Sequence, residues 1–143
     1  MRLLITGSRT WPDQGRLWHV LDQTAQALAH HNKDRYIAEG LHLVSGHAYG
    51  ADAQAEAWFA DRFPLEEAEL WRADWKQGKR AGVVRNVAMV DSRPDVCVAF
   101  IMPCDKDTCR RGELHGSHGA MHCAEYAERQ GVPTTRFYGG GLS

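Results

Sequence analysis

Leu41 to Asp52 reads Leu-His-Leu-Val-Ser-Gly-His-Ala-Tyr-Gly-Ala-Asp: a short apolar run, a turn with two glycines, and the start of a helix-forming segment. Glycine lets the main chain approach a phosphate closely, and the first amides of a helix have no partner inside that helix. Those amides also lie at the positive end of the helix dipole. The stretch therefore predicts a phosphate-bearing ligand, with plain packing of a strand against a helix as the alternative. The residues of this turn expected to bind it are Ser45, Gly46, Gly50, Ala51 and Asp52.

Strand-like and helix-like segments alternate on both sides of this stretch. Strands are expected at Arg2–Thr6, Leu41–Ser45, Glu69–Trp71, Val96–Ile101 and Val132–Phe137. Helices are expected to end near His31, to cover Ala51–Phe63 and Val83–Val90, and to run from about Gly119 to Gly131. Such alternation implies right-handed crossovers and a parallel sheet. We therefore expect one α/β domain over residues 1–138, Rossmann-like and three-layered, with about five mostly parallel strands, helices on both faces, and a flexible tail at 139–143.

Composition limits the classes of partner. The chain has 143 residues, and its 17 Lys+Arg against 18 Asp+Glu give a net charge of −1. A near-zero charge produces no long-range field that would attract nucleic acid or an anionic membrane. There is no apolar run long enough to span a bilayer, and the N-terminal apolar run is too short for a signal peptide. We expect a cytoplasmic protein with no membrane partner and with reduced thiols.

Ligands of parallel α/β sheets bind beyond the carboxyl ends of the strands, at the point where the strand order reverses. Three further segments should lie at that edge: the turn after the first strand, the basic stretch 73–86, and the loop from Pro103 to Gly119. Arginine offers a planar fork that matches phosphate, whereas a tight turn and a solvated helix face are the alternatives. The ligand-binding residues expected from these segments are Gly7, Ser8, Arg9, Trp75, Lys79, Arg85, Asn86, Ser117 and Gly119.

The loop after Pro103 is rich in cysteine and histidine. Thiolate and imidazole are the usual zinc ligands, so the loop raises the question of a metal site. The spacing matches no common zinc motif, and a polar, mobile loop that covers the cleft explains the composition as well. We therefore expect no metal, and keep as the weaker alternative a site made of Cys104, Cys109, His115 and His118.

Taken together, these segments resemble the SLOG superfamily, and most closely its small YspA-like branch. The likeness spans nearly the whole chain. The motifs that carry it are Gly-Ser-Arg-Thr-Trp at 7–11, Ser-Gly-x-Ala-x-Gly-Ala-Asp at 45–52, Ala-Asp-Trp at 73–75, Gly-Lys-x-Ala-Gly at 78–82 and Arg-Asn-x-x-Met at 85–89. The resemblance implies a Rossmann-like domain that binds a nucleotide or nucleotide-derived small molecule without a required cofactor. Its members include the DNA-processing protein DprA and the LOG phosphoribohydrolases.

One departure from the LOG enzymes bears on activity. Those enzymes carry a Gly-Gly-x-Gly-Thr-x-x-Glu loop, whereas residues 116–123 read Gly-Ser-His-Gly-Ala-Met-His-Cys. Cleavage of an N-glycosidic bond needs a carboxylate near the reacting carbon. The weak catalytic candidates are Arg85, which looks like the LOG arginine, and the carboxylates of Glu113 and Asp52. We expect a sensor or sequestering module; a LOG-like N-glycosidase is the alternative, and DprA-like binding of single-stranded DNA is a lesser one. The apolar helix faces also allow a homo-oligomer.

Overall fold

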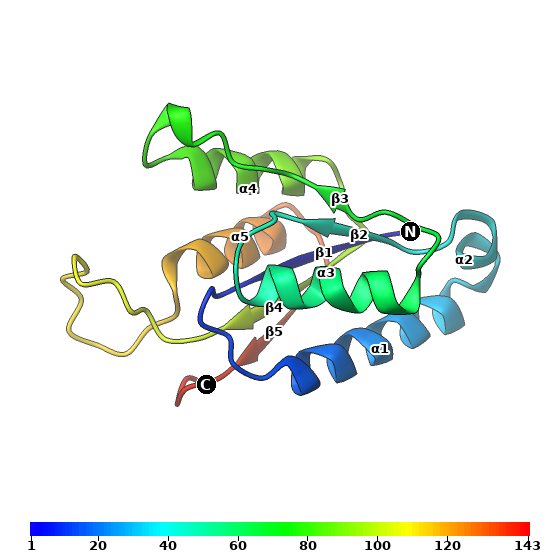
Figure 1. Ribbon diagram of the computed structural model, residues 1–143, viewed down its shortest axis with the longest axis horizontal. Coiled ribbons are helices and arrows are strands. Elements are labelled where there is room, and N and C mark those ends of the chain that lie inside the picture. Colours follow the sequence, from blue (N-terminus) through cyan, green and yellow to red (C-terminus); the bar gives the residue numbers. More distant parts are fainter.

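The computed structural model describes residues 1–143 and shows an α/β protein built on one five-stranded sheet (Figure 1). All strand pairs are parallel, and the strand order is β3-β2-β1-β4-β5. The strands are β1 (Arg2–Gly7), β2 (His42–Ser45), β3 (Glu69–Leu70), β4 (Val96–Ile101) and β5 (Thr134–Tyr138). The helices are α1 (Gln14–His31), α2 (Lys33–Glu39), α3 (Ala51–Arg62), α4 (Ala81–Asp91) and α5 (His118–Arg129), with a short 3₁₀ turn, η1, at Trp75–Gln77. The expected Rossmann-like three-layer fold is confirmed.

Two helical layers cover the two faces of the sheet. Leu3 and Ile5 of β1 pack with α1 and α3, whereas Leu4 packs with α4 and α5 on the other face (Figure 1). Because both faces are covered, β4 and the centre of β1, Leu3–Ile5, are continuously apolar rather than alternating. Trp58 and Phe59 of α3 are fully buried in the larger cluster. Each fully buried side chain of this kind contributes about 1.5–3 kcal/mol.

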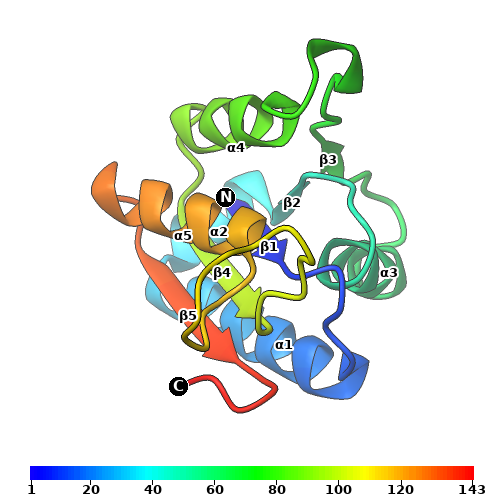
Figure 2. The same cartoon turned by 90° about the vertical axis from the view of Figure 1, so that its left-hand side faces the viewer.

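The strand order reverses between β1 and β4, and this places the site. From β1 the chain steps outward through β2 to β3, then returns to β4 on the other side of β1. Figure 2 looks at this edge of the sheet and shows the loop between β4 and α5, residues 102–117, in front of the strands. The adjacent ends of β1 and β4, paired at Gly7 and Phe100, therefore open onto the position where parallel α/β folds bind ligands.

Some local structure differs from the sequence expectation. Helix α2 was not expected, because it buries no residue and so shows no apolar period. The turn η1 was not predicted either, because three residues are too few to show a helical pattern of apolar residues.

Leu142 of the C-terminal tail packs against a small cluster that includes Ile101 and Ala120. None of the helices combines the length and the apolar character that crossing a membrane requires.

Candidate functional site

A cavity of about 520 Å³ opens at the carboxyl edge of the sheet, where β1 and β4 end and α4 and α5 begin. Its wall contains most of the predicted ligand-binding residues. Those present are Gly7, Ser8, Arg9, Asp52, Trp75, Lys79, Arg85, Asn86, Ser117 and Gly119. The four predicted segments do meet at this edge, as the parallel topology requires.

Ser8 forms the floor of the cavity and joins three elements. Its amide donates to the Phe100 carbonyl at 2.8 Å, and its hydroxyl accepts from the Met102 amide at 2.9 Å. The same hydroxyl is hydrogen-bonded to the hydroxyl of Ser117 at the start of α5. Gly7 is required beside it, because a Cβ there would lie 2.8 Å from the Phe100 carbonyl oxygen and would clash with Ala51. The floor is therefore fixed before any ligand arrives.

The turn at residues 45–50 contributes Ala48 to the wall and otherwise supports the wall from behind. Ser45, Gly46, Gly50 and Ala51, all predicted to bind the ligand, do not line the main cavity. The Ser45 hydroxyl donates to Glu56 at 2.8 Å, and the Ala51 amide donates to the Ser8 carbonyl at 3.2 Å. Gly50 has a φ of 73° and lies against the Arg9 backbone. Gly46 lines a smaller adjacent hollow of about 450 Å³ instead. The amides expected to hold phosphate here are partly engaged by the protein itself.

Arg85 holds the turn to α4. Its Nη1 donates to the carbonyls of Gly46 at 2.5 Å and Trp71 at 3.3 Å, and its Nε donates to Asn86 Oδ1 at 3.0 Å. Asn86 is 4% exposed, and its Nδ2 donates to the Gly119 carbonyl at 3.3 Å. These bonds fix the guanidinium in the wall and link α4 to α5.

Asp52, in the first turn of α3, is a buried carboxyl in the cavity wall. Burial raises the pKa of Asp52 to about 7, although the Ala48 amide and the nearby Arg85 favour the ionised form. Its Oδ2 accepts from the Ala48 amide at 3.2 Å, whereas Oδ1 has no hydrogen-bond partner. A buried carboxyl oxygen without a partner can accept from a ligand hydroxyl, or donate to the ligand when protonated. A pKa near 7 makes Asp52 suited to proton exchange near neutral pH.

The open side of the cavity carries cations and one aromatic ring. Arg9, Lys79 and Lys106 join Arg85 in the lining, and Trp75 on the rim is 58% exposed. The first residues of α5, from His118 to Ala120, also face the cavity. A Cβ on Gly119 would meet no atom within 4 Å, so the space in front of this helix start is open.

Several lining residues were not among the predicted ligand-binding set. They are Thr6, Thr10, Ala48, Gly82, Val83, Met89, Cys104, Asp105, Lys106, His118 and Ala120. Their segments follow the carboxyl ends of strands, where a ligand is expected. Nothing in the sequence, however, indicates how residues 102–117 fold back over the cavity. Glu113 does not line the cavity; its backbone carbonyl accepts from His115 Nδ1 at 2.8 Å.

The comparisons with known proteins agree with this arrangement. The sequence model of the YspA, cpYpsA-related SLOG family (YAcAr) matches residues 1–78, which is more than half of the chain. The chain belongs to this SLOG family. The matched region runs from β1 to η1 and includes Gly7, Asp52 and Trp75 of the cavity wall. Membership in a SLOG family suggests, in general terms, a small-molecule ligand related to nucleotides.

A relative matches over nearly the full length. The Gene 61 protein of Mycobacterium phage D29 is 38% identical over 141 residues, and the match covers 95% of each chain. This likeness therefore includes α4, the loop 102–117 and α5, which lie beyond the part that the SLOG family model matches.

Proposed function

We propose that this protein binds a nucleotide or nucleotide-derived phosphate ligand in the cavity at the carboxyl edge of its sheet, as a sensor or sequestering module. The observation that carries the proposal is the lining itself. Four cationic side chains, the start of α5 and an exposed tryptophan surround one cavity at the strand-order reversal. These are the kinds of group that contact the phosphate, the sugar and the base of a nucleotide.

Each part of such a ligand has a matching group. The amides at the start of α5 and the side chains of Arg9 and Lys79 provide positive potential for phosphate. Asp52 offers an unpartnered oxygen to a ribose hydroxyl. Trp75 offers a flat face to a base, and aromatic stacking adds about 0.5–1.5 kcal/mol beyond buried area. The volume of about 520 Å³ falls in the range of small-molecule sites.

Calorimetry with nucleoside monophosphates, ADP-ribose and cyclic nucleotides tests this proposal. The wild type should bind at least one of them with a Kd well below 1 mM. Lys79→Ala should weaken that binding by about 10- to 100-fold, since a charge-assisted hydrogen bond is worth about 1.5–3 kcal/mol. Lys33→Ala is the matched control, because Lys33 is an exposed lysine of α2 that lines neither hollow.

A variant that fills the cavity separates binding from folding. Gly119→Leu places a side chain into the open space at the start of α5, while the shorter Gly119→Ala leaves most of that space free. We expect Gly119→Leu to abolish binding at an unchanged melting temperature. Equal affinity in both variants, or no nucleotide bound by the wild type, would remove the proposal.

Hydrolysis of an N-glycosidic bond is a second function that one observation favours. Asp52 is a carboxyl in the cavity wall with a pKa raised by burial to about 7 and a free oxygen, which is the kind of group that glycoside cleavage uses. Release of free base from nucleoside monophosphates, followed by chromatography, tests it. Asp52→Asn should abolish release, and Glu113→Gln should leave it unchanged because Glu113 does not line the cavity. If the wild type releases no free base, the hydrolase hypothesis is wrong and the proposed function is binding alone.

A further inference from the structure

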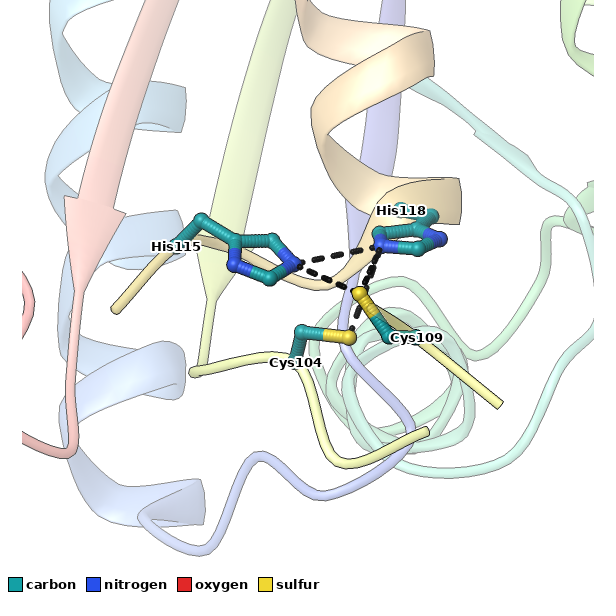
Figure 3. A group of neighbouring side chains, drawn as sticks. All are labelled: Cys104, Cys109, His115 and His118. Carbon is teal, nitrogen blue, oxygen red and sulfur yellow. Dashed lines mark hydrogen bonds between the residues drawn. The ribbon is translucent and has the colours of Figure 1, made fainter. Parts of the chain in front are cut away.

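Four side chains of the β4–α5 loop and of the first residue of α5 come together at one point. Figure 3 shows Cys104, Cys109, His115 and His118 with their sulfur and nitrogen atoms turned toward one another. One ligand atom from each lies within 4.8 Å of all the others. All four cysteines of the chain are free, so no disulfide accounts for the arrangement. We propose that these four residues form a Cys₂His₂ zinc site that holds the loop against α5.

Four of the six distances between the ligand atoms match those of a tetrahedral zinc site, and the other two are below 4.8 Å. With Zn–S near 2.3 Å and Zn–N near 2.05 Å, sulfur and nitrogen ligands should lie about 3.5 Å apart and two nitrogens about 3.3 Å apart. Cys109 Sγ lies 3.4 Å from His115 Nε2 and 3.5 Å from His118 Nε2, and Cys104 Sγ lies 3.5 Å from His118 Nε2. The two Nε2 atoms are 3.2 Å apart. Each of these separations is within a few tenths of an ångström of the tetrahedral value.

Hydrogen bonding alone does not account for this convergence. His115 Nδ1 lies 2.8 Å from the Glu113 carbonyl oxygen, so Nδ1 carries the ring proton and Nε2 is left with a lone pair. His118 Nε2 has three neighbours in the cluster, and a single N–H can donate to one of them. A cation that accepts four lone pairs satisfies every atom at once. The carbonyl of Glu113 then acts as the outer partner that orients a ligating imidazole.

The backbone of the loop brings the ligands into place. Pro103 and Gly116 form an antiparallel bridge, and the Cys104 amide donates to the His115 carbonyl at 2.8 Å. The Cys109 amide donates to the Lys106 carbonyl at 3.1 Å, which turns the loop back toward Cys104. The ligands are therefore adjacent in space although their spacing in the sequence fits no common zinc motif. The sequence made a metal site the weaker alternative, but the geometry of the folded loop favours it.

The donor set selects the metal and the type of site. Two thiolates and two imidazoles with no carboxylate favour zinc over magnesium or calcium. Four protein ligands leave no open position for water, so the zinc is structural rather than catalytic. Binding exchanges the thiol protons for the metal, and no oxidant or reductant is needed. Cys104 and His118 also line the main cavity, so the metal would fix part of its wall.

Metal binding by the reduced full-length chain tests the proposal. Apoprotein is titrated with Zn²⁺ against a chromophoric chelator, and separately with Co²⁺ as a spectroscopic probe. We expect one Zn²⁺ per chain, together with thiolate-to-cobalt charge-transfer absorption and the visible bands of tetrahedral Co²⁺. Cys109→Ser and His115→Gln should each weaken Zn²⁺ binding by more than about 100-fold, the upper end of the effect of removing an outer-shell partner.

Two controls keep the test decisive. His30→Gln changes an exposed histidine of α1 away from the cluster and should bind Zn²⁺ like the wild type. Circular dichroism should show an intact fold in both ligand variants, because their side chains lie in the loop and outside the hydrophobic clusters. Less than one Zn²⁺ per reduced wild-type chain would overturn the proposal. So would wild-type affinity in His115→Gln, or a Cys104–Cys109 disulfide that forms in air while the reduced apoprotein binds no metal.

Discussion

The Asp52 carboxyl makes stability depend on pH. Burial raises the pKa of Asp52 from 3.8 to about 7, so the folded protein holds this proton more tightly than the unfolded chain does. The contribution to stability is therefore complete below pH 3.8, decreases as pH rises to about 7, and is constant above that. This difference in pKa between the unfolded and folded states corresponds to a change of roughly 4 kcal/mol at most in the free energy of unfolding.

Asp52→Asn cannot ionise, and it should lose this pH dependence. We expect the melting temperature of the variant minus that of the wild type to increase from pH 4 to pH 7 and then to level off. Thermal melts by circular dichroism across this range measure the difference. Asp34→Asn, an exposed carboxyl of α2, is the control and should give a difference that stays nearly flat. A flat difference for Asp52→Asn as well would show that this carboxyl is not desolvated in the folded state.

At the scale of elements, Gly50 allows the turn before α3 to pack against the chain that follows β1. Gly50 has a φ of 73°, and a Cβ there would lie within 2.6 Å of the Arg9 Cα. Gly50→Ala combines a strained backbone with a clash against main chain that cannot move aside, so we expect a loss of at least about 2 kcal/mol in the free energy of unfolding. Chemical denaturation measures this loss. Gly112→Ala is the matched control, because its Cβ would meet no atom within 4 Å; equal stability of the two variants would refute the argument.

The elements also show how far the sequence can predict this fold. Val96–Ile101 was predicted with its observed bounds, because an apolar run covered on both faces has few other interpretations. Helix α2 was missed because its contacts bury none of its residues. Ligands of parallel α/β sheets bind beyond the carboxyl ends of the strands, and this general rule correctly predicts that Arg9, Lys79 and Asn86 lie at one cavity.

The rest of the site depends on long-range geometry that local patterns do not encode. Ser45 is the last residue of β2, and Gly50 lies in the turn that follows. However, the Ser45 hydroxyl donates to Glu56, and Gly50 packs against the Arg9 backbone. The glycines correctly predict that another group comes close to this backbone, but that group is the protein's own Arg9 backbone and not a ligand phosphate. The contribution of Lys106 depends on how residues 102–117 fold back, and the polar composition of this loop does not determine that.

For the whole molecule, the distribution of charge argues against nucleic acid as a partner. The net charge is −1. Four arginines outside the cavity are paired with carboxylates. These pairs are Arg2–Glu69, Arg35–Asp95, Arg62–Asp22 and Arg136–Glu128. Binding to a phosphate backbone is driven by several unpaired cations that release counterions along an extended track. Four further cations, Arg9, Lys79, Arg85 and Lys106, line a cavity of small-molecule size instead of an extended track.

We therefore expect no binding of single-stranded DNA at about 0.1 M salt, where exposed charges more than about 10 Å apart are largely screened. Fluorescence anisotropy of a labelled oligonucleotide measures this, with a DprA protein on the same oligonucleotide as the positive control. Binding that weakens steeply with added salt would contradict the expectation, because a steep slope counts several phosphate contacts along an extended strand. Weak binding that a mononucleotide abolishes, and that Gly119→Leu lacks, would have a different meaning. It would place the end of the strand in the cavity, as one more nucleotide rather than as a nucleic-acid track.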